Sequence, residues 1–121
     1  IDRSGKVLAF RREHYPDGSL SDAHSLASQL VSAVSQMIEE QTATAPVAAV
    51  GVGIPGLVLQ PSQRAASVPH LPDLSKLDLQ SELADKFGVP VHFDNNANAA
   101  AFAEMACGIA RGVNDFLYLH I

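Results

Sequence analysis

Short polar side chains gather in one stretch of the sequence, Asp94-Asn95-Asn96-Ala97-Asn98. An apolar segment expected to be a strand comes before it, and an alanine-rich segment expected to be a helix comes after it. Asp94 or Asn95 could simply cap that helix by accepting hydrogen bonds from its first N–H groups. A cluster of amides can also hydrogen-bond several hydroxyls at once, as binding of a polyol such as a sugar requires. Both interpretations stand, although the asparagines are more than one cap needs.

A second candidate is the glycine pattern of residues 51–56, G-V-G-I-P-G, with Asp73 about twenty residues further on. This spacing is that of a dinucleotide-binding loop, in which a helix begins within the glycines and its N–H groups meet the pyrophosphate. Pro55 has no N–H group, and residues 56–64 show no helical pattern. We therefore reject a dinucleotide site. We expect a strand end and a type I or II turn in which Gly56 takes the positive dihedral angle.

The histidines and the cysteine do not form a metal-binding pattern. No two of the five histidines stand four residues apart, and Cys107 is the single cysteine. His70 lies in a proline-flanked loop, where a ligand contact and an ordinary surface position are both open. The serines of the first expected helix show no nucleophile pattern. We predict neither a metal site nor a catalytic triad.

An alternation of strands and helices must position these residues. A turn is expected at 16–18, before the first helix, and Ser19 or Ser21 is available as the N-cap of that helix. Gly88 and Gly108 are expected to end the second and third helices. The run at 47–54 is apolar throughout, which is typical of a central strand covered on both faces. A proline-rich loop should follow Gly56. The patterns predict strands at 7–15, 47–54, 89–93 and 113–121 and helices at 20–41, 78–87 and 95–107. This order predicts an α/β fold with a mixed, largely parallel sheet.

Composition excludes several classes of protein. The 121 residues amount to one domain or part of one, and 47% hydrophobic with 17% charged residues excludes disorder. A net charge of −5 argues against nucleic-acid binding by this segment. The sequence has neither a membrane span nor a signal peptide, and one cysteine suits a reducing compartment, so a cytoplasmic protein is expected. The absence of an initial Met and the apolar last residues indicate a piece of a longer chain.

Four stretches of the sequence are informative together: GVGIPGLV at 51–58, VPHLP at 68–72, VPVHFDNNANAA at 89–100, and AE at 103–104 with GIARG at 108–112. In combination they resemble the ROK family of bacterial sugar kinases and sugar-responsive repressors. The resemblance implies the RNase H-like, actin-like ATPase fold, in which two domains enclose a sugar and ATP in a cleft. It implies that residues 1–121 are part of the N-terminal domain, with the first strand and its phosphate loop before them and the second domain after them.

The sequence departs from the family kinases at one position. After the strand those kinases read Glu/Asp-Asn-Asp-Ala-Asn, and the second acidic residue is the base that takes the proton of the sugar hydroxyl. Asn96 stands at that position here, and an amide cannot accept the proton, so general-base help of roughly 10²- to 10⁴-fold should be lost. Sugar binding can persist, because Asn96 keeps a donor and an acceptor. The resemblance implies sugar contacts by Asn95, Asn96, Ser67 and Gly56.

We therefore interpret the chain as the sugar-sensing domain of a ROK-type transcriptional regulator. The resemblance implies a homo-oligomer that binds a small-molecule sugar and reaches DNA only through a domain outside residues 1–121, with no cofactor in this segment. The alternative is an active ROK sugar kinase, dependent on ATP and Mg²⁺, in which Asp94 replaces the lost base. In an extended segment Asp94 and Asn96 point the same way, whereas at the start of a helix they diverge.

Overall fold

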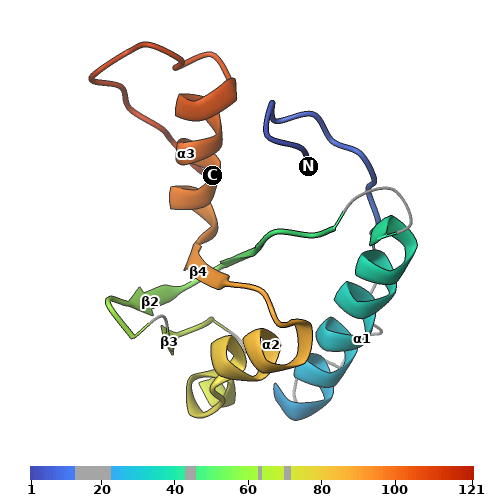
Figure 1. Ribbon diagram of the computed structural model, residues 1–121. Helices are drawn as coiled ribbons and strands as arrows, with labels where there is room; N and C mark the ends of the chain where they lie inside the picture. The colour runs from blue at the N-terminus through green and yellow to red at the C-terminus, as the bar shows by residue number, and fades with distance from the viewer. Residues whose placement is uncertain (13–22, 43–45, 63, 70–71) are drawn as a thin grey trace.

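The computed structural model describes residues 1–12, 23–42, 46–62, 64–69 and 72–121. β1 and β4 form a parallel pair, and β2 and β3 form an antiparallel hairpin (Figure 1). The predicted α/β class with a parallel sheet is confirmed. The elements are α1 (Ala23–Thr42), β1 (Val50–Ile54), β2 (Leu57–Leu59), β3 (Arg64–Ser67), the 3₁₀ helix η2 (Pro72–Lys76), α2 (Leu79–Phe87), β4 (Val91–Asn95) and α3 (Asn96–Cys107).

All three predicted α-helices are present, and their ends follow local signals. Asp78 precedes α2, and its carboxylate accepts a hydrogen bond of 3.3 Å from the Ser81 N–H. Gly88 ends α2 in the left-handed conformation, with φ 63°, which a residue without Cβ adopts at little cost. Asn95 caps α3, and Gly108 follows its last turn. The expected turn at 16–18 and the caps at Ser19 or Ser21 lie outside the described residues.

The parallel pair brings two strand ends to the same edge. Its register runs from Val50 opposite Val91 to Ile54 opposite Asn95. Parallel strands point the same way, so the turn after β1 and the helix after β4 begin side by side. The expectation that residues 47–54 form a central strand covered on both faces is wrong. Residues 47–49 are not in the strand, β4 is the one neighbour of β1 among the described residues, and within β1 only Ile54 is buried.

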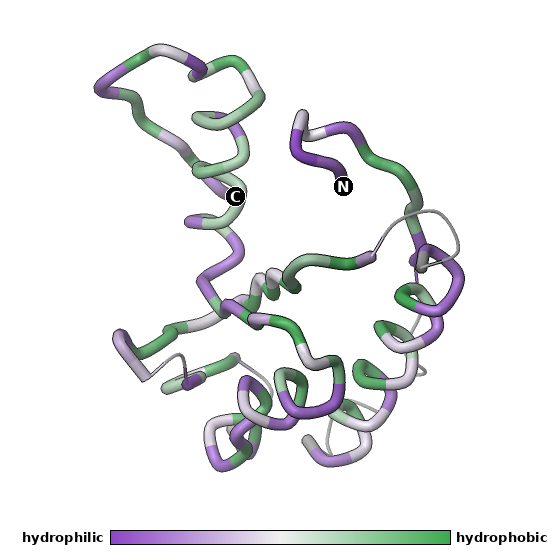
Figure 2. Tube along the Cα trace, in the orientation of Figure 1, coloured by the Kyte–Doolittle hydropathy of each residue, from purple (hydrophilic) through white to green (hydrophobic). Residues whose placement is uncertain are grey.

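Two predicted strands are not formed by the described residues. Residues 7–12 and 113–121 are irregular and exposed, with Phe10 77% and Leu117 91% exposed. A strand needs a neighbour for its N–H and C=O groups, and neither segment pairs with another described one. Figure 2 shows the chain turning back after α3, with hydrophobic and hydrophilic residues mixed along this C-terminal segment. The remainder of the first predicted strand, 13–15, lies outside the described residues.

The hairpin corrects the prediction of a loop after Gly56. Leu57 pairs with Ser67, Val58 with Ala65 and Leu59 with Arg64, with an irregularity between Leu57 and Val58. The strands comprise three and four residues, which is too short for period-two alternation to stand out from the surrounding prolines. Their pairing, rather than their sequence pattern, makes them strands.

The hydrophobic core lies between β1 and β4, the hairpin, η2, α1 and α2. Leu83 of α2 is fully buried and Phe93 of β4 is 2% exposed. By contrast, α3 has no buried residue, and its Phe102 is 59% exposed. The core therefore holds β4 firmly, and α3 extends from the end of that strand on the side away from α2 (Figure 1). None of the described helices is both long and apolar enough to cross a membrane.

Candidate functional site

The four residues suggested as sugar contacts come from three segments, and the structure brings them together at one edge of the parallel pair. Gly56 lies in the turn between β1 and β2, and Ser67 ends β3. Asn95 ends β4, and Asn96 begins α3. The contacts described below join these segments directly. No metal or ligand is needed to explain why they converge.

Asn95 connects two of the segments through its side chain. Its Nδ2 donates a hydrogen bond of 2.7 Å to the Gly56 carbonyl. Its Oδ1 accepts hydrogen bonds from the N–H groups of Ala97 at 2.8 Å and Asn98 at 3.4 Å. The predicted capping role of Asn95 is confirmed, and the bond to Gly56 adds a link that capping alone does not require.

Gly56 lies against the backbone of Ser67. A Cβ atom on Gly56 would overlap the Ser67 carbonyl oxygen and would stand 3.0 Å from the Val68 Cα. The Gly56 N–H donates to the Ile54 carbonyl at 2.9 Å, which makes a three-residue turn centred on Pro55. The predicted type I or II turn is therefore wrong, and Gly56 is not among the glycines with positive φ. Close approach to Ser67, rather than a special dihedral angle, is what excludes a side chain here.

Ser67 presents its hydroxyl beside this contact. The residue is exposed, and its side chain has no hydrogen-bond partner among the described residues. The hydroxyl is one donor with two acceptor lone pairs. It is thus available to a polar ligand.

Asn96 occupies the first position of α3, close to the end of β1. A Cβ on Gly53 would lie 3.4 Å from the Asn96 Cα and 3.8 Å from the Ala99 Cβ, which is ordinary van der Waals contact, so the first turn of α3 lies directly against the end of β1. The Asn96 Oδ1 accepts from the Ala97 N–H at 2.9 Å. Its Nδ2 has no partner within the described part of the chain. Gly53 was not among the residues suggested as sugar contacts, although its place at a strand end was the available signal.

Asp94 is held away from the position that Asn96 takes. Its Oδ1 accepts from the Asn95 N–H at 2.7 Å and from the Asn98 Nδ2 at 3.0 Å. The helix begins at Asn96, so the two side chains do not follow the alternation of an extended strand. Asn98 was not assigned a role from sequence, and its spacing of four residues from Asp94 was the signal that could have found it.

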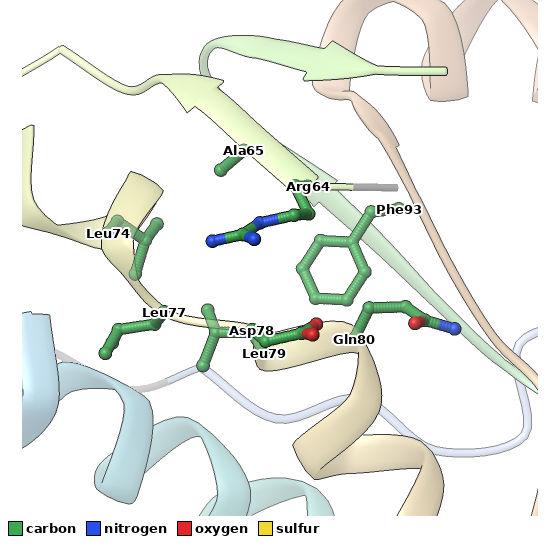
Figure 3. A pocket seen from close by; sticks show the side chains of 8 residues that line it. All are labelled: Arg64, Ala65, Leu74, Leu77, Asp78, Leu79, Gln80 and Phe93. Atoms are coloured by element: carbon green, nitrogen blue, oxygen red, sulfur yellow. The ribbon is translucent and has the colours of Figure 1, made fainter. Parts of the chain in front are cut away.

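A small pocket is lined by residues of β3, η2, α2 and β4 and by the segment between η2 and α2. Figure 3 shows the Arg64 side chain extending across it above Asp78, with Leu74 and Leu77 at its far wall. None of the four suggested sugar contacts lines this pocket. Among the described residues, no group of three or more His, Cys, Asp or Glu side chains could hold a metal ion. His70 lies outside the described residues.

Comparison with known proteins assigns the family. The ROK family model matches residues 1–121, and the chain belongs to the ROK family. The resemblance seen in the four sequence stretches is thereby confirmed.

The relatives include both repressors and kinases. The chain is 31% identical to the xylose repressor of Caldicellulosiruptor bescii over 98 residues, which cover 77% of this chain and 24% of that protein. It is 36% identical to the xylose repressor of Bacillus spizizenii over 78 residues, which cover 63% of this chain and 20% of that protein. The glucokinase of Streptomyces coelicolor is 25% identical over 112 residues, which cover 93% of this chain and 32% of that protein. The chain thus spans a third or less of these relatives.

Proposed function

We propose that this chain is part of the sugar-sensing domain of a ROK-family transcriptional regulator. The observation that carries the proposal is the amide Asn96, which the family resemblance aligns with the catalytic base of the family kinases. In this structure the amide is at the first position of α3, beside the end of β1. It can donate to a hydroxyl and accept from one, but it cannot remove a proton. The site therefore suits recognition of a sugar without its chemical conversion.

The relatives also support a regulator rather than a kinase. The two xylose repressors are 31% and 36% identical to this chain, whereas the glucokinase is 25% identical. On the proposed function the ligand is a small sugar, and an aldopentose such as xylose is the first to test. Asn95, Asn96, Ser67 and Gly56 would surround its hydroxyls. A regulator of this kind acts in the cytoplasm on operator DNA, which it reaches through a DNA-binding domain outside residues 1–121.

We place these residues in the N-terminal domain of the actin-like ATPase fold. The family assignment supports this fold, and so does the parallel pair β1–β4, whose two ends meet at the proposed site. The matched segments cover 20% to 32% of the three relatives, which supports a longer protein with further domains. Such a regulator is expected to be a homo-oligomer.

A second candidate function is an ATP-dependent sugar kinase, which the glucokinase match over 93% of the chain favours. It would need ATP with Mg²⁺, and the resemblance puts the phosphate loop for ATP outside residues 1–121. The glycines at 51–56 are not such a loop, because they lead from β1 directly into β2 and a phosphate cradle uses free N–H groups at the start of a helix. Asp94 would have to serve as the base, and its Oδ1 already accepts hydrogen bonds from Asn95 and Asn98.

Sugar binding and phosphotransfer by the full-length protein together test the proposal. Calorimetry with xylose, glucose and fructose should show binding by the wild type, and a coupled ADP-release assay with ATP and Mg²⁺ should show no turnover. Asn96→Ala should weaken binding roughly 5- to 150-fold, because ligand hydroxyls lose a donor and an acceptor. Asn96→Asp is nearly isosteric, should bind within a few-fold of the wild type, and restores a carboxylate. Rapid turnover by the wild type that persists in Asn96→Ala would refute the sensor and favour the kinase.

A further inference from the structure

Leu57 has an exposed apolar side chain beside the proposed sugar site. It follows Gly56 directly in the chain and begins β2. Leu57 is 67% exposed, whereas the next residue, Val58, is partly buried and packs against the hydrophobic core. Successive side chains of a strand point to opposite faces. Leu57 therefore lies on the face of the hairpin that points away from the core.

The pairing of the hairpin puts Ser67 next to Leu57 on that face. Leu57 of β2 is directly opposite Ser67 of β3. Residues opposite each other in an antiparallel pair have their side chains on the same face, with Cβ atoms about 4.5–5.5 Å apart. The next pair, Val58 and Ala65, packs in the core on the other face. A sugar that reaches the Ser67 hydroxyl therefore lies beside Leu57.

The surroundings of Leu57 are polar. The carbonyl of Gly56 is bonded to the Asn95 amide, and the Ser67 hydroxyl is exposed. An apolar side chain among these groups offers no hydrogen bond. A polar group of a sugar that is set against it loses water without a replacement partner, which is unfavourable. An apolar part of the sugar gains from the same contact. Leu57 thus distinguishes between the edges of a bound sugar.

We infer that Leu57 is a specificity-determining residue that makes the site prefer an aldopentose to an aldohexose. The inference rests on the proposed function and names its ligand class. In the pyranose ring of an aldopentose, C5 is a methylene group and is the ring carbon without a hydroxyl. In an aldohexose the same carbon carries a hydroxymethyl group. When the hydroxyls bind the polar groups of the site, the C5 edge is the part of the sugar that suits Leu57.

Sugar affinities of the full-length protein measure this preference. The probes for calorimetry are xylose, glucose and 6-deoxyglucose, which has a methyl group in place of the hydroxymethyl group. The wild type should bind xylose roughly 3- to 30-fold more tightly than glucose, because one small apolar contact discriminates to about this extent. It should also bind 6-deoxyglucose more tightly than glucose, because the methyl group keeps this edge apolar.

Leu57→Asn changes the polarity of this position at nearly constant size. The amide gives the edge donors and an acceptor for the hydroxymethyl group. Xylose should therefore bind more weakly and glucose more tightly, so that the two affinities become roughly equal. Leu59→Asn is the matched control at the other leucine of β2, which is 54% exposed and pairs with Arg64. It should keep the wild-type ratio. Both positions are exposed, so both melting temperatures should stay close to that of the wild type.

The possible results separate the inference from the proposed function. If the wild type binds glucose as tightly as xylose, or if Leu57→Asn keeps the wild-type ratio, the inference is overturned and the sensor proposal stands. An equal change of the ratio in Leu59→Asn would also overturn it, because the place beside Ser67 would then have no special effect. A wild type that binds neither xylose nor glucose overturns the inference as well. Absence of binding for every sugar tested refutes the sensor proposal too.

Discussion

Gly56 and Ser67 touch through their backbones, and the contact leaves no space for a side chain on Gly56. It holds the turn after β1 against the end of β3, and the Asn95 side chain is bonded to the carbonyl of the same glycine. Two segments of the proposed site are therefore placed by one residue that contributes no side chain. Its substitution is the most direct test of the arrangement.

Gly56→Ala should destabilise the protein by about 1–3 kcal/mol, because the added methyl group must displace the Ser67 backbone. Urea unfolding of the full-length protein gives the measurement. Gly51→Ala is the matched control, since a Cβ there meets nothing within 4 Å. Gly51 lies in β1, the strand that leads into the turn of Gly56. The change in stability of Gly51→Ala should be within about 1 kcal/mol and can be favourable. Equal effects at the two positions would contradict the contact.

Leu83→Ala should cost about 2–5 kcal/mol, since Leu83 is fully buried and its loss leaves a cavity among tightly packed neighbours. Leu8→Ala removes the same atoms from a side chain that is 57% exposed and should change stability by less than about 0.5 kcal/mol. Thermal or urea unfolding measures both. A small effect at Leu83 would mean that α2 does not pack against β4 as described.

Asp78→Ala should cost about 0.5–2 kcal/mol, because the Ser81 N–H at the start of α2 loses its acceptor. Asp78→Ser should recover most of the loss, since serine also caps helices. Asp85→Ala changes an exposed aspartate later in the same helix and serves as the control for charge. If Asp78→Ser is as unstable as Asp78→Ala, capping is not the reason for the loss.

The pKa of Asp2 lies below its ordinary value. The largest cause is the Ser4 hydroxyl, which donates a hydrogen bond to the Asp2 carboxylate, and the backbone N–H groups of Lys6 and Ser4 add to it. A lowered pKa in the folded state favours the ionised form. Its contribution to stability is present above about pH 4 and is lost as the pH falls through the lowered pKa. Ser4→Ala should raise the pKa of Asp2 in a carboxyl NMR titration, and Ser62→Ala should leave it unchanged. An unaltered pKa in Ser4→Ala would show that the hydroxyl bond is not formed.

The sequence by itself determined the helices. It also determined that a polar stretch lies between an apolar strand and an alanine-rich helix at the site. The N-cap at Asp78, the glycine that ends α2, and the cap at Asn95 act within a few residues of themselves. Periodicity and capping are local effects, so they can be predicted without knowing the rest of the fold. The family resemblance also needed only sequence, and the family match confirmed it.

Strand partners and contacts between distant segments were decided by the tertiary structure. Residues 7–12 and 113–121 are apolar enough for strands, but strand formation needs a neighbour, and no described segment supplies one. The hairpin β2–β3 exists because its two short segments pair with each other. Gly56 belongs to the site through a close contact that no turn pattern predicts. The hydrogen bond from Asn95 to Gly56 spans 39 residues, and only the parallel alignment of β1 with β4 brings its two atoms within 2.7 Å.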